Sequence, residues 1–242
     1  MIEWVKTGTY RTQQVAERIH QSWGKFVKLG SLRRLFKVNK LIYKRIRKSC
    51  RHLRDPVAYE FFRTEVQALR AWAASGEIDL CYCDEMGVSR QAVVPYGWQP
   101  VGKSEAYVPA TPSGNLTTLG FLYEDNRFES YLQQGAMNSA MLVKCMDDFA
   151  SRLVKKTVVI LDNASTHTSE LFRSRLAVWR KQGLHIQYIP AYCPELNLIE
   201  CLWKQIKYHW LDPLDFLTAA SLRAALEAIL TQIGTKYRIT FA

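Results

Sequence analysis

Residues 155–211 read KKTVVILDNASTHTSELFRSRLAVWRKQGLHIQYIPAYCPELNLIECLWKQIKYHWL, and we expect the rest of the chain to be organised around this stretch. Its apolar run Val158–Leu161 gives way to Asp162 and a turn, and Glu200 stands where a later helix should open. A short apolar run bounded by turn-forming residues predicts a buried strand. Carboxylates at the C-terminal ends of such strands face the ligand crevice of α/β sheets. The stretch therefore predicts two acids directed toward one edge of a sheet.

The chain before this stretch shows strand patterns from Ile78 onward. The segment IDLCYCD (78–84) predicts a short, largely buried strand that ends at Asp84. Further strands are expected in AVVPYGW (92–98), EAYVPA (105–110), LTTLGFLY (116–123) and FESYL (128–132). Gly and Pro turns and a polar turn at 124–127 separate them, so we expect them to be antiparallel neighbours.

Helices and strands then alternate. Asn138 is expected to cap a helix that carries Leu142 and Phe149, and a helix with Phe172 and Trp179 on one face follows the strand that ends at Asp162. The strand LHIQYIP (184–190), the helix opened by Glu200 and a last amphipathic helix through Leu222 and Ile233 complete the order. The pattern predicts an α/β domain with a mixed sheet flanked by helices.

The N-terminal third is helical and basic. One helix is predicted from Tyr10 to Trp23, ended by Gly24, and a second, basic one from Leu32 to Leu41 with Ser31 as its N-cap. Together they resemble the second half of a helix-turn-helix. The segment YKRIRKSCRHLR (43–54) suits a linker that lies along phosphates. Asp55 and Pro56 then predict a helix start, with an apolar face running toward Gly76.

The net charge of +11 is confined to this third. Residues 1–77 carry 17 Lys and Arg against 6 Asp and Glu, whereas residues 78–242 carry 16 of each. No acid occurs between Glu17 and Asp55. A helix face that is only solvated usually contains acids that pair with its basic residues, and such acids are missing there. Such a segment is typical of nucleic-acid binding. The residues expected to contact DNA are Arg33, Arg34, Lys37, Lys40, Lys44, Arg45, Arg47 and Lys48, with Lys204 and Lys207 beyond Glu200.

Length and composition exclude other classes. The 242 residues, 48% of them hydrophobic, are enough for one sizeable domain with a small appendage. No apolar run is long enough to cross a bilayer and the start lacks a signal-peptide pattern, so no membrane partner and a cytoplasmic location are expected. The six cysteines match neither a disulfide framework nor a paired zinc motif and are interpreted as reduced thiols. We expect residues 1–54 to form a DNA-binding segment and linker, and residues 55–242 a catalytic domain.

Three acids that are distant in sequence, Asp84, Asp162 and Glu200, are candidates to converge at one sheet edge. Converging carboxylates raise one another's pKa or hold cations. Two magnesium ions could be held there, activating a water or a 3′-hydroxyl for phosphoryl displacement. Any one acid alone could instead be a surface or capping carboxylate.

The segments YCDE (82–85), LDNASTH (161–167) and PELNLIE (194–200) resemble the three catalytic blocks of DDE transposases, in the branch that unites bacterial insertion-sequence enzymes with the mariner superfamily. The resemblance implies an RNase H-like fold, with Asp84, Asp162 and Glu200 as the catalytic and metal-binding triad, and two magnesium ions, or manganese, as cofactors. It also implies cleavage and strand transfer at transposon ends, with double-stranded DNA (terminal repeats and target) as partner, a homodimer or larger assembly, and a nucleoid-associated location in a bacterium.

Other residues of these blocks receive weaker assignments. Glu85 is the less suitable acid of its pair, because the family uses the first one. Asn163 and His167 belong to the second block, and each could either contact a phosphate or only pack in the turn. Trp203 is interpreted as a core residue. Many family members have proline where this chain has Leu198.

The N-terminal region departs from the family pattern. Only 83 residues precede Asp84, which leaves room for one helix-turn-helix where family enzymes usually carry two. A truncated, catalytically inactive transposase that competes for DNA or represses expression is therefore the alternative function. An RNase H-like nuclease acting on RNA:DNA hybrids is a third hypothesis, which the PELNLIE block disfavours.

Overall fold

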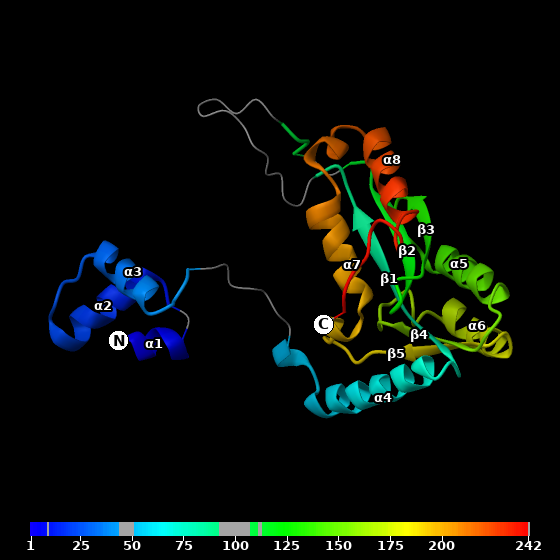
Figure 1. Cartoon of the computed structure of the whole chain (residues 1–242), viewed down its shortest axis with the longest axis horizontal. Coiled ribbons are helices and arrows are strands. Elements are labelled where there is room, and N and C mark those ends of the chain that lie inside the picture. The colour runs from blue at the N-terminus through cyan, green and yellow to red at the C-terminus, as the bar shows by residue number, and fades with distance from the viewer. Residues whose placement is uncertain (9, 44–50, 92–106, 111–112, 242) are drawn as a thin grey trace. The chain divides into compact units, whose positions relative to one another are not determined.

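The computed structural model describes all residues except 9, 44–50, 92–106, 111–112 and 242. The chain divides into two compact units, Met1–Ser49 and Cys50–Ala242, which are described separately (Figure 1). Among the helices that the structure describes, none has the length and apolar character needed to cross a membrane.

The described residues of the first unit form helices α1 (Ile2–Thr7), α2 (Thr12–Trp23) and α3 (Leu29–Val38). Val15 and Ile19 of α2 and Leu32 of α3 form its small buried core. Gly24 adopts a left-handed conformation, φ 65°, and its N–H donates to the carbonyl of His20, so α2 ends where the sequence predicted.

Helix α3 is shifted from its expected bounds of Leu32–Leu41. It begins after Lys28, and the N–H of Ser31 donates to the carbonyl of Lys28, so Ser31 lies inside the first turn and is not the N-cap. The helix ends early because Lys40 is left-handed, φ 57°, and the N–H of Leu41 returns to the carbonyl of Phe36. This is the Schellman arrangement, formed here without glycine.

The second unit begins with a short 3₁₀ turn, η1 (Arg51–Leu53), and the long helix α4 (Pro56–Ala74). The Asp55 side chain accepts hydrogen bonds from the N–H groups of Val57 and Ala58, at 2.8 and 3.3 Å, and Pro56 occupies the first helical position. The helix start predicted at Asp55 and Pro56 is confirmed. Phe62 and Val66 on its inner face are buried.

In the part of the second unit that the structure describes, five strands form one mixed sheet in the order β3-β2-β1-β4-β5. β1 pairs antiparallel with β2, and β2 with β3, whereas β4 and β5 run parallel to β1. The expected mixed sheet is therefore confirmed. The strands are β1 (Asp79–Val88), β2 (Leu116–Tyr123), β3 (Phe128–Gln134), β4 (Thr157–Leu161) and β5 (Leu184–Tyr188).

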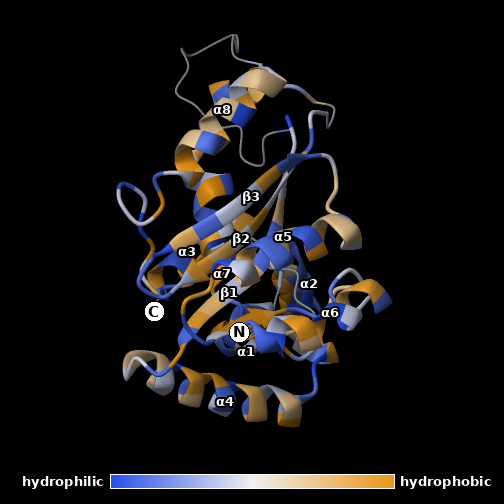
Figure 2. Cartoon of the chain, turned by 90° about the vertical axis from the view of Figure 1, so that its right-hand side faces the viewer, coloured by the Kyte–Doolittle hydropathy of each residue, from blue (hydrophilic) through white to orange (hydrophobic). Residues whose placement is uncertain are grey.

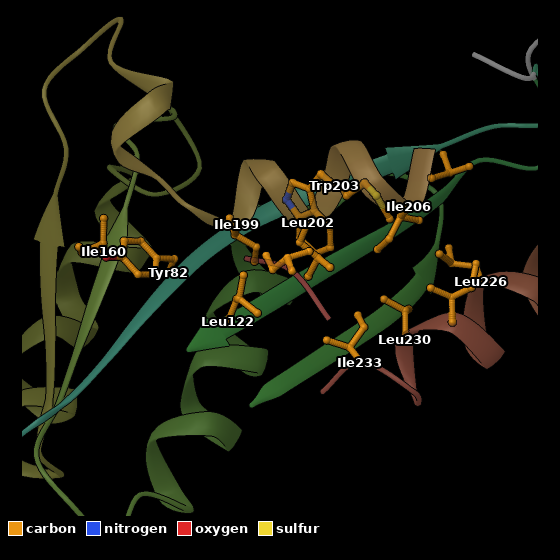
Figure 3. Packing of buried hydrophobic residues seen from close by; sticks show 14 of the residues in the cluster. Tyr82, Leu122, Ile160, Ile199, Leu202, Trp203, Ile206, Leu226, Leu230 and Ile233 are labelled. Atoms are coloured by element: carbon orange, nitrogen blue, oxygen red, sulfur yellow. The ribbon is translucent and has the colours of Figure 1, made fainter. Parts of the chain in front are cut away.

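Helices cover both faces of this sheet (Figure 1). Helices α5 (Ser139–Ser151) and α6 (Glu170–Lys181) pack with the odd-numbered residues Cys81 and Cys83 of β1. Leu80, Tyr82 and Met86 belong to the opposite core, with α4, α7 (Ile199–Gln205) and α8 (Ala219–Leu230). Figure 3 shows Tyr82 among the buried residues of this core. Hydrophobic residues follow the central strands between these layers (Figure 2). The remaining helical elements are η2 (Pro194–Leu196), the π-helical turn η3 (Ile206–Trp210) and η4 (Pro213–Leu217).

The first strand does not end at Asp84, as the sequence indicated, but continues to Val88. The reason is its antiparallel partner, which remains hydrogen-bonded as far as the pair Val88 and Leu116. The strand expected at 92–98 lies outside the described residues, as does the first part of the one expected at 105–110. Residues 107–110 form no strand.

Candidate active site

Two of the three candidate acids lie at the same level of adjacent parallel strands. The register pairs Tyr82 of β1 with Ile160 of β4, and Asp84 and Asp162 each follow two residues later. Beyond this level β4 ends, while β1 continues beside β2 alone, with Asp84 opposite Gly120. The two carboxylates therefore stand where the parallel part of the sheet stops.

The third acid, Glu200, is the second residue of α7. The loop before it is fixed to β1 by Asn197, which is buried and whose side-chain N–H donates to the carbonyl of Cys83 at 2.9 Å. Cys83 directly precedes Asp84, so this hydrogen bond brings the start of α7 to the first acid. Asn197 belongs to the segment PELNLIE (194–200). The sequence offered no signal for its hydrogen bond to Cys83, because that residue is 114 positions away.

Glu200 and Asp162 are close enough to affect Asp84 electrostatically. Burial raises the pKa of Asp84 to about 7, and the negative charges of Glu200 and Asp162 add to the increase. A carboxyl surrounded by carboxylates gains stability when it is protonated or when a cation is bound. The arrangement therefore brings the three predicted acids into one electrostatic group.

Asp162 is half exposed and is oriented by two donors that share its Oδ1 atom. His167 Nδ1 lies 2.6 Å away, and the backbone N–H of Ala164 lies 3.1 Å away. The hydrogen bond from His167 is the main reason that the pKa of Asp162 is lowered. Oδ2 takes part in neither hydrogen bond.

His167 connects Asp162 to Glu85. The imidazole is fully buried, and its Nε2 lies 3.0 Å from Glu85 Oε2. Burial alone would lower the pKa of His167, but the hydrogen bonds to Asp162 and Glu85 outweigh it and raise the pKa to about 10. His167 is therefore an imidazolium at neutral pH that donates from both ring nitrogens.

Glu85 is directed away from the group of acids. Successive side chains of a strand point to opposite faces, so Asp84 faces the layer of α7 and Glu85 the layer of α5 and α6. There Glu85 is the partner of His167. Asp84 and Glu85 therefore lie on opposite faces of the sheet, with Asp84 on the face that α7 covers.

Two further residues, one inside and one just beyond the motifs, have structural partners. The side-chain N–H of Asn163 donates to the carbonyl of Ile189 at 2.7 Å, which ties the turn after β4 to the end of β5. The indole N–H of Trp203 donates to Asp84 Oδ2 at 3.1 Å. Trp203 is buried, as a core residue should be, but the sequence did not reveal its contact with the first acid.

The donor set fits a hard divalent cation. Asp84, Asp162 and Glu200 offer only carboxylate oxygens, which are the ligands that magnesium and manganese prefer. As the side chains stand, no three His, Cys, Asp or Glu residues in the described part of the chain are grouped closely enough to hold a metal ion. Asp162 is hydrogen-bonded to His167 instead.

The basic residues expected to contact DNA fall into three groups. Arg33, Arg34 and Lys37 are exposed on α3, and Lys40 is exposed just after it. Lys204 is exposed on α7, and Lys207 is partly buried in the turn that follows. The other four, Lys44, Arg45, Arg47 and Lys48, lie outside the described residues.

Comparison with known families identifies the second unit. Residues 79–223, which include all three acids, match the family model described as DDE superfamily endonuclease. The chain belongs to this family. For this DDE endonuclease, the RNase H-like α/β fold expected from the sequence is confirmed. No curated protein sequence matches the chain.

Solved structures of Mos1 transposase share the fold of this DDE endonuclease. The paired-end complex with the left transposon end is 16% identical, with a TM-score of 0.66 over 94% of this chain and 68% of that one. The strand transfer complex is 14% identical, with a TM-score of 0.62 over 93% and 72%. The mariner paired-end complex with Mn is 16% identical, with a TM-score of 0.60 over 95% and 69%.

Replacing Asp84 with Asn should reduce the pH dependence of stability. Because the pKa of Asp84 is about 7 in the folded state and 3.8 ordinarily, the folded protein binds this proton more tightly. The contribution of this proton binding to the free energy of unfolding is complete below pH 3.8 and is lost as the pH rises through about 7. Urea titrations should show the free energy of unfolding falling more steeply from about pH 5 to about pH 8 in wild type than in D84N. If the free energy of unfolding changed equally with pH in wild type and D84N, the raised pKa would not belong to Asp84.

Proposed function

We propose that this DDE endonuclease is a transposase that cleaves DNA at transposon ends and joins the freed 3′-hydroxyl to target DNA. The observation that carries the proposal is the electrostatic group of Asp84, Asp162 and Glu200, in which two acids contribute to the raised pKa of the third. Three motifs of one family supply these acids. Two Mos1 structures with this fold, a paired-end complex with a transposon end and a strand transfer complex, support the same reaction class.

Asp84, Asp162 and Glu200 would hold the divalent metal. Two magnesium ions, with manganese as a substitute, would activate the attacking oxygen and stabilise the leaving oxygen. In cleavage, a water oxygen bonds to the phosphorus and the 3′ oxygen of the transposon end leaves as a hydroxyl. In transfer, that hydroxyl attacks a target phosphodiester and displaces the target's own 3′ oxygen.

The side chains around the acids have positioning roles in this proposal. His167 and the N–H of Ala164 hold Asp162 through Oδ1, which leaves Oδ2 for a cation. Asn197 holds the start of α7, and with it Glu200, against β1. Glu85 holds His167 from the opposite side and has no contact role toward the metal.

Residues 1–54 would bind the DNA and residues 55–242 would carry out the chemistry. Helix α3 presents Arg33, Arg34 and Lys37 from a small helical unit, and such cations bind phosphates with little regard to sequence. A homodimer or larger assembly on two DNA ends is part of the proposal, because the related Mos1 complexes are described as paired-end complexes.

The proposal is tested on DNA that contains the gene with several hundred base pairs of its natural flanks on both sides. Purified protein is incubated with this plasmid and Mg²⁺ or Mn²⁺, with EDTA as the control, and 3′ ends are mapped by sequencing. Metal-dependent cuts at two positions flanking the gene support a transposase. Binding without any cut supports the inactive competitor, and preferential cutting of an RNA:DNA hybrid supports the nuclease.

Removing the cations of α3 should weaken DNA binding and its salt dependence. The triple variant R33A/R34A/K37A is expected to lower the slope of log K against log salt by up to about 2.7, that is about 0.9 for each lost phosphate contact. Fluorescence anisotropy with a labelled duplex at several salt concentrations measures this slope.

The chain offers a matched control on another helix. R173A/R180A/K181A removes two arginines and one lysine that are exposed on α6, and it should leave the slope unchanged. Equal effects of the two triple variants would show that net charge alone governs binding, and α3 would then have no special role.

A further inference from the structure

Trp203 links the helix that carries the third acid to the strand that carries the first. Its indole N–H donates to Asp84 Oδ2 at 3.1 Å, and the side chain is 3% exposed. Glu200 lies three residues earlier on α7, about one helical turn away. One turn of helix thus supplies an acid of the proposed triad and a buried donor to another acid.

The position of the indole ring is fixed from two sides. Gly120 of β2 lies opposite Asp84, and a Cβ atom at Gly120 would stand 2.5 Å from Cη2 of Trp203. The strand therefore lacks a side chain where the ring lies. Phe128 contacts the same ring edge-on, with 6.1 Å between centroids and an interplanar angle of 81°. Figure 3 shows Trp203 among the buried residues that α7 contributes to this core.

We propose that Trp203 is a positioning residue for Asp84, which holds its carboxylate in the orientation that binds the divalent cation. The inference rests on the proposed function, since it requires Asp84 to be a metal ligand. The donor engages one carboxylate oxygen and so restricts rotation about the Cβ–Cγ bond. An indole N–H can only donate, so it cannot compete for the cation. Gly120 permits this contact by leaving space for the ring.

The test compares Trp203→Phe with a matched variant elsewhere in the same unit. Trp179 is also fully buried, and its indole N–H donates to Asp147 Oδ1 at 2.7 Å in the layer of α5 and α6. Trp179→Phe therefore removes the same kind of hydrogen bond away from the acids. Mn²⁺ binding to the full chain is measured by electron paramagnetic resonance, with D84N defining the share of binding that depends on Asp84.

We expect W203F to weaken the Asp84-dependent Mn²⁺ affinity by about 10-fold to 100-fold, the usual effect of losing a hydrogen bond to a metal ligand. W179F should change that affinity less than about twofold. Thermal melts monitor folding of both variants. If W203F does not fold, site-specific incorporation of benzothienylalanine at position 203 keeps the ring and its packing but removes the N–H, and the same loss of affinity is expected.

The outcomes separate the inference from the function on which it rests. Wild-type protein that binds Mn²⁺ through Asp84, together with a W203F variant of unchanged affinity, would overturn the positioning role and leave the proposed function standing. Equal losses in W203F and W179F would also overturn it, because they would reflect general loosening of the core. Wild-type protein without Asp84-dependent binding would contradict the metal site itself.

Discussion

Replacing Asp162 with Asn should reduce metal-dependent DNA cleavage about a thousandfold or more, with little change in the fold. The substitution keeps the size of the side chain but removes the negative charge that would hold the cation. Stabilisation of the transition-state charge by a bound metal contributes several kcal/mol, and each 1.36 kcal/mol corresponds to a factor of ten in rate. Single-turnover cleavage of the flanked plasmid, quantified on denaturing gels, measures the effect.

Asp148→Asn is the control for this experiment. Asp148 is an exposed acid of α5 that is hydrogen-bonded to Tyr131 and Arg152, and the proposed reaction gives it no role. Its variant should cleave at close to the wild-type rate. If D162N kept more than about a tenth of the wild-type cleavage rate, the proposed triad would be contradicted, because loss of a metal ligand should lower the rate far more.

Replacing His167 with Ala should destabilise the protein by about 3 kcal/mol, since removing one partner of a buried ion pair leaves the other charge uncompensated. His167 is completely buried, and Glu85 is only 19% exposed. Asp162 would lose a partner as well, but it is half exposed and water can replace the contact. Urea unfolding at neutral pH measures the difference from wild type.

The loss caused by His167→Ala should also depend on pH. The pKa of His167 is raised from 6.5 to about 10 in the folded state, so its contribution is full below pH 6.5 and is lost as the pH rises through about 10. The stability gap between wild type and H167A should narrow accordingly at high pH. His185→Gln, at a partly exposed histidine of β5, should show a small gap with no such narrowing. A gap for H167A that is independent of pH would mean that neutral packing, not charge, is lost.

Elements with local causes were predictable from the sequence. The start of α4 follows from the chemistry of Asp55 and Pro56, and the end of α2 follows from Gly24, because capping involves neighbouring residues. Asp162 could be placed because its apolar strand ends where its own sequence changes. Asp84 was predicted at the end of its strand, but it lies inside the strand. The strand around Asp84 extends to Val88 because of its pairing with β2, a partner that periodicity alone does not identify.

The supporting residues of the site depended on tertiary contacts and could not be read from spacing. Asn197, Trp203 and His167 bond to partners 114, 119 and 82 residues away, respectively. The sequence placed each of them in or beside a motif but assigned none of these contacts. Family resemblance thus predicted the candidate acids, whereas the structure shows the donors beside them.

Anomalous diffraction from crystals grown with Mn²⁺ shows whether Asp84, Asp162 and Glu200 hold a divalent cation. The scattering of manganese identifies the ion independently of how the protein around it is interpreted. We expect an anomalous peak contacted by carboxylate oxygens of Asp84, Asp162 and Glu200, with Trp203 still bonded to Asp84. A peak held by other side chains, or none beside these acids in protein that cleaves DNA with Mn²⁺, would contradict this metal site.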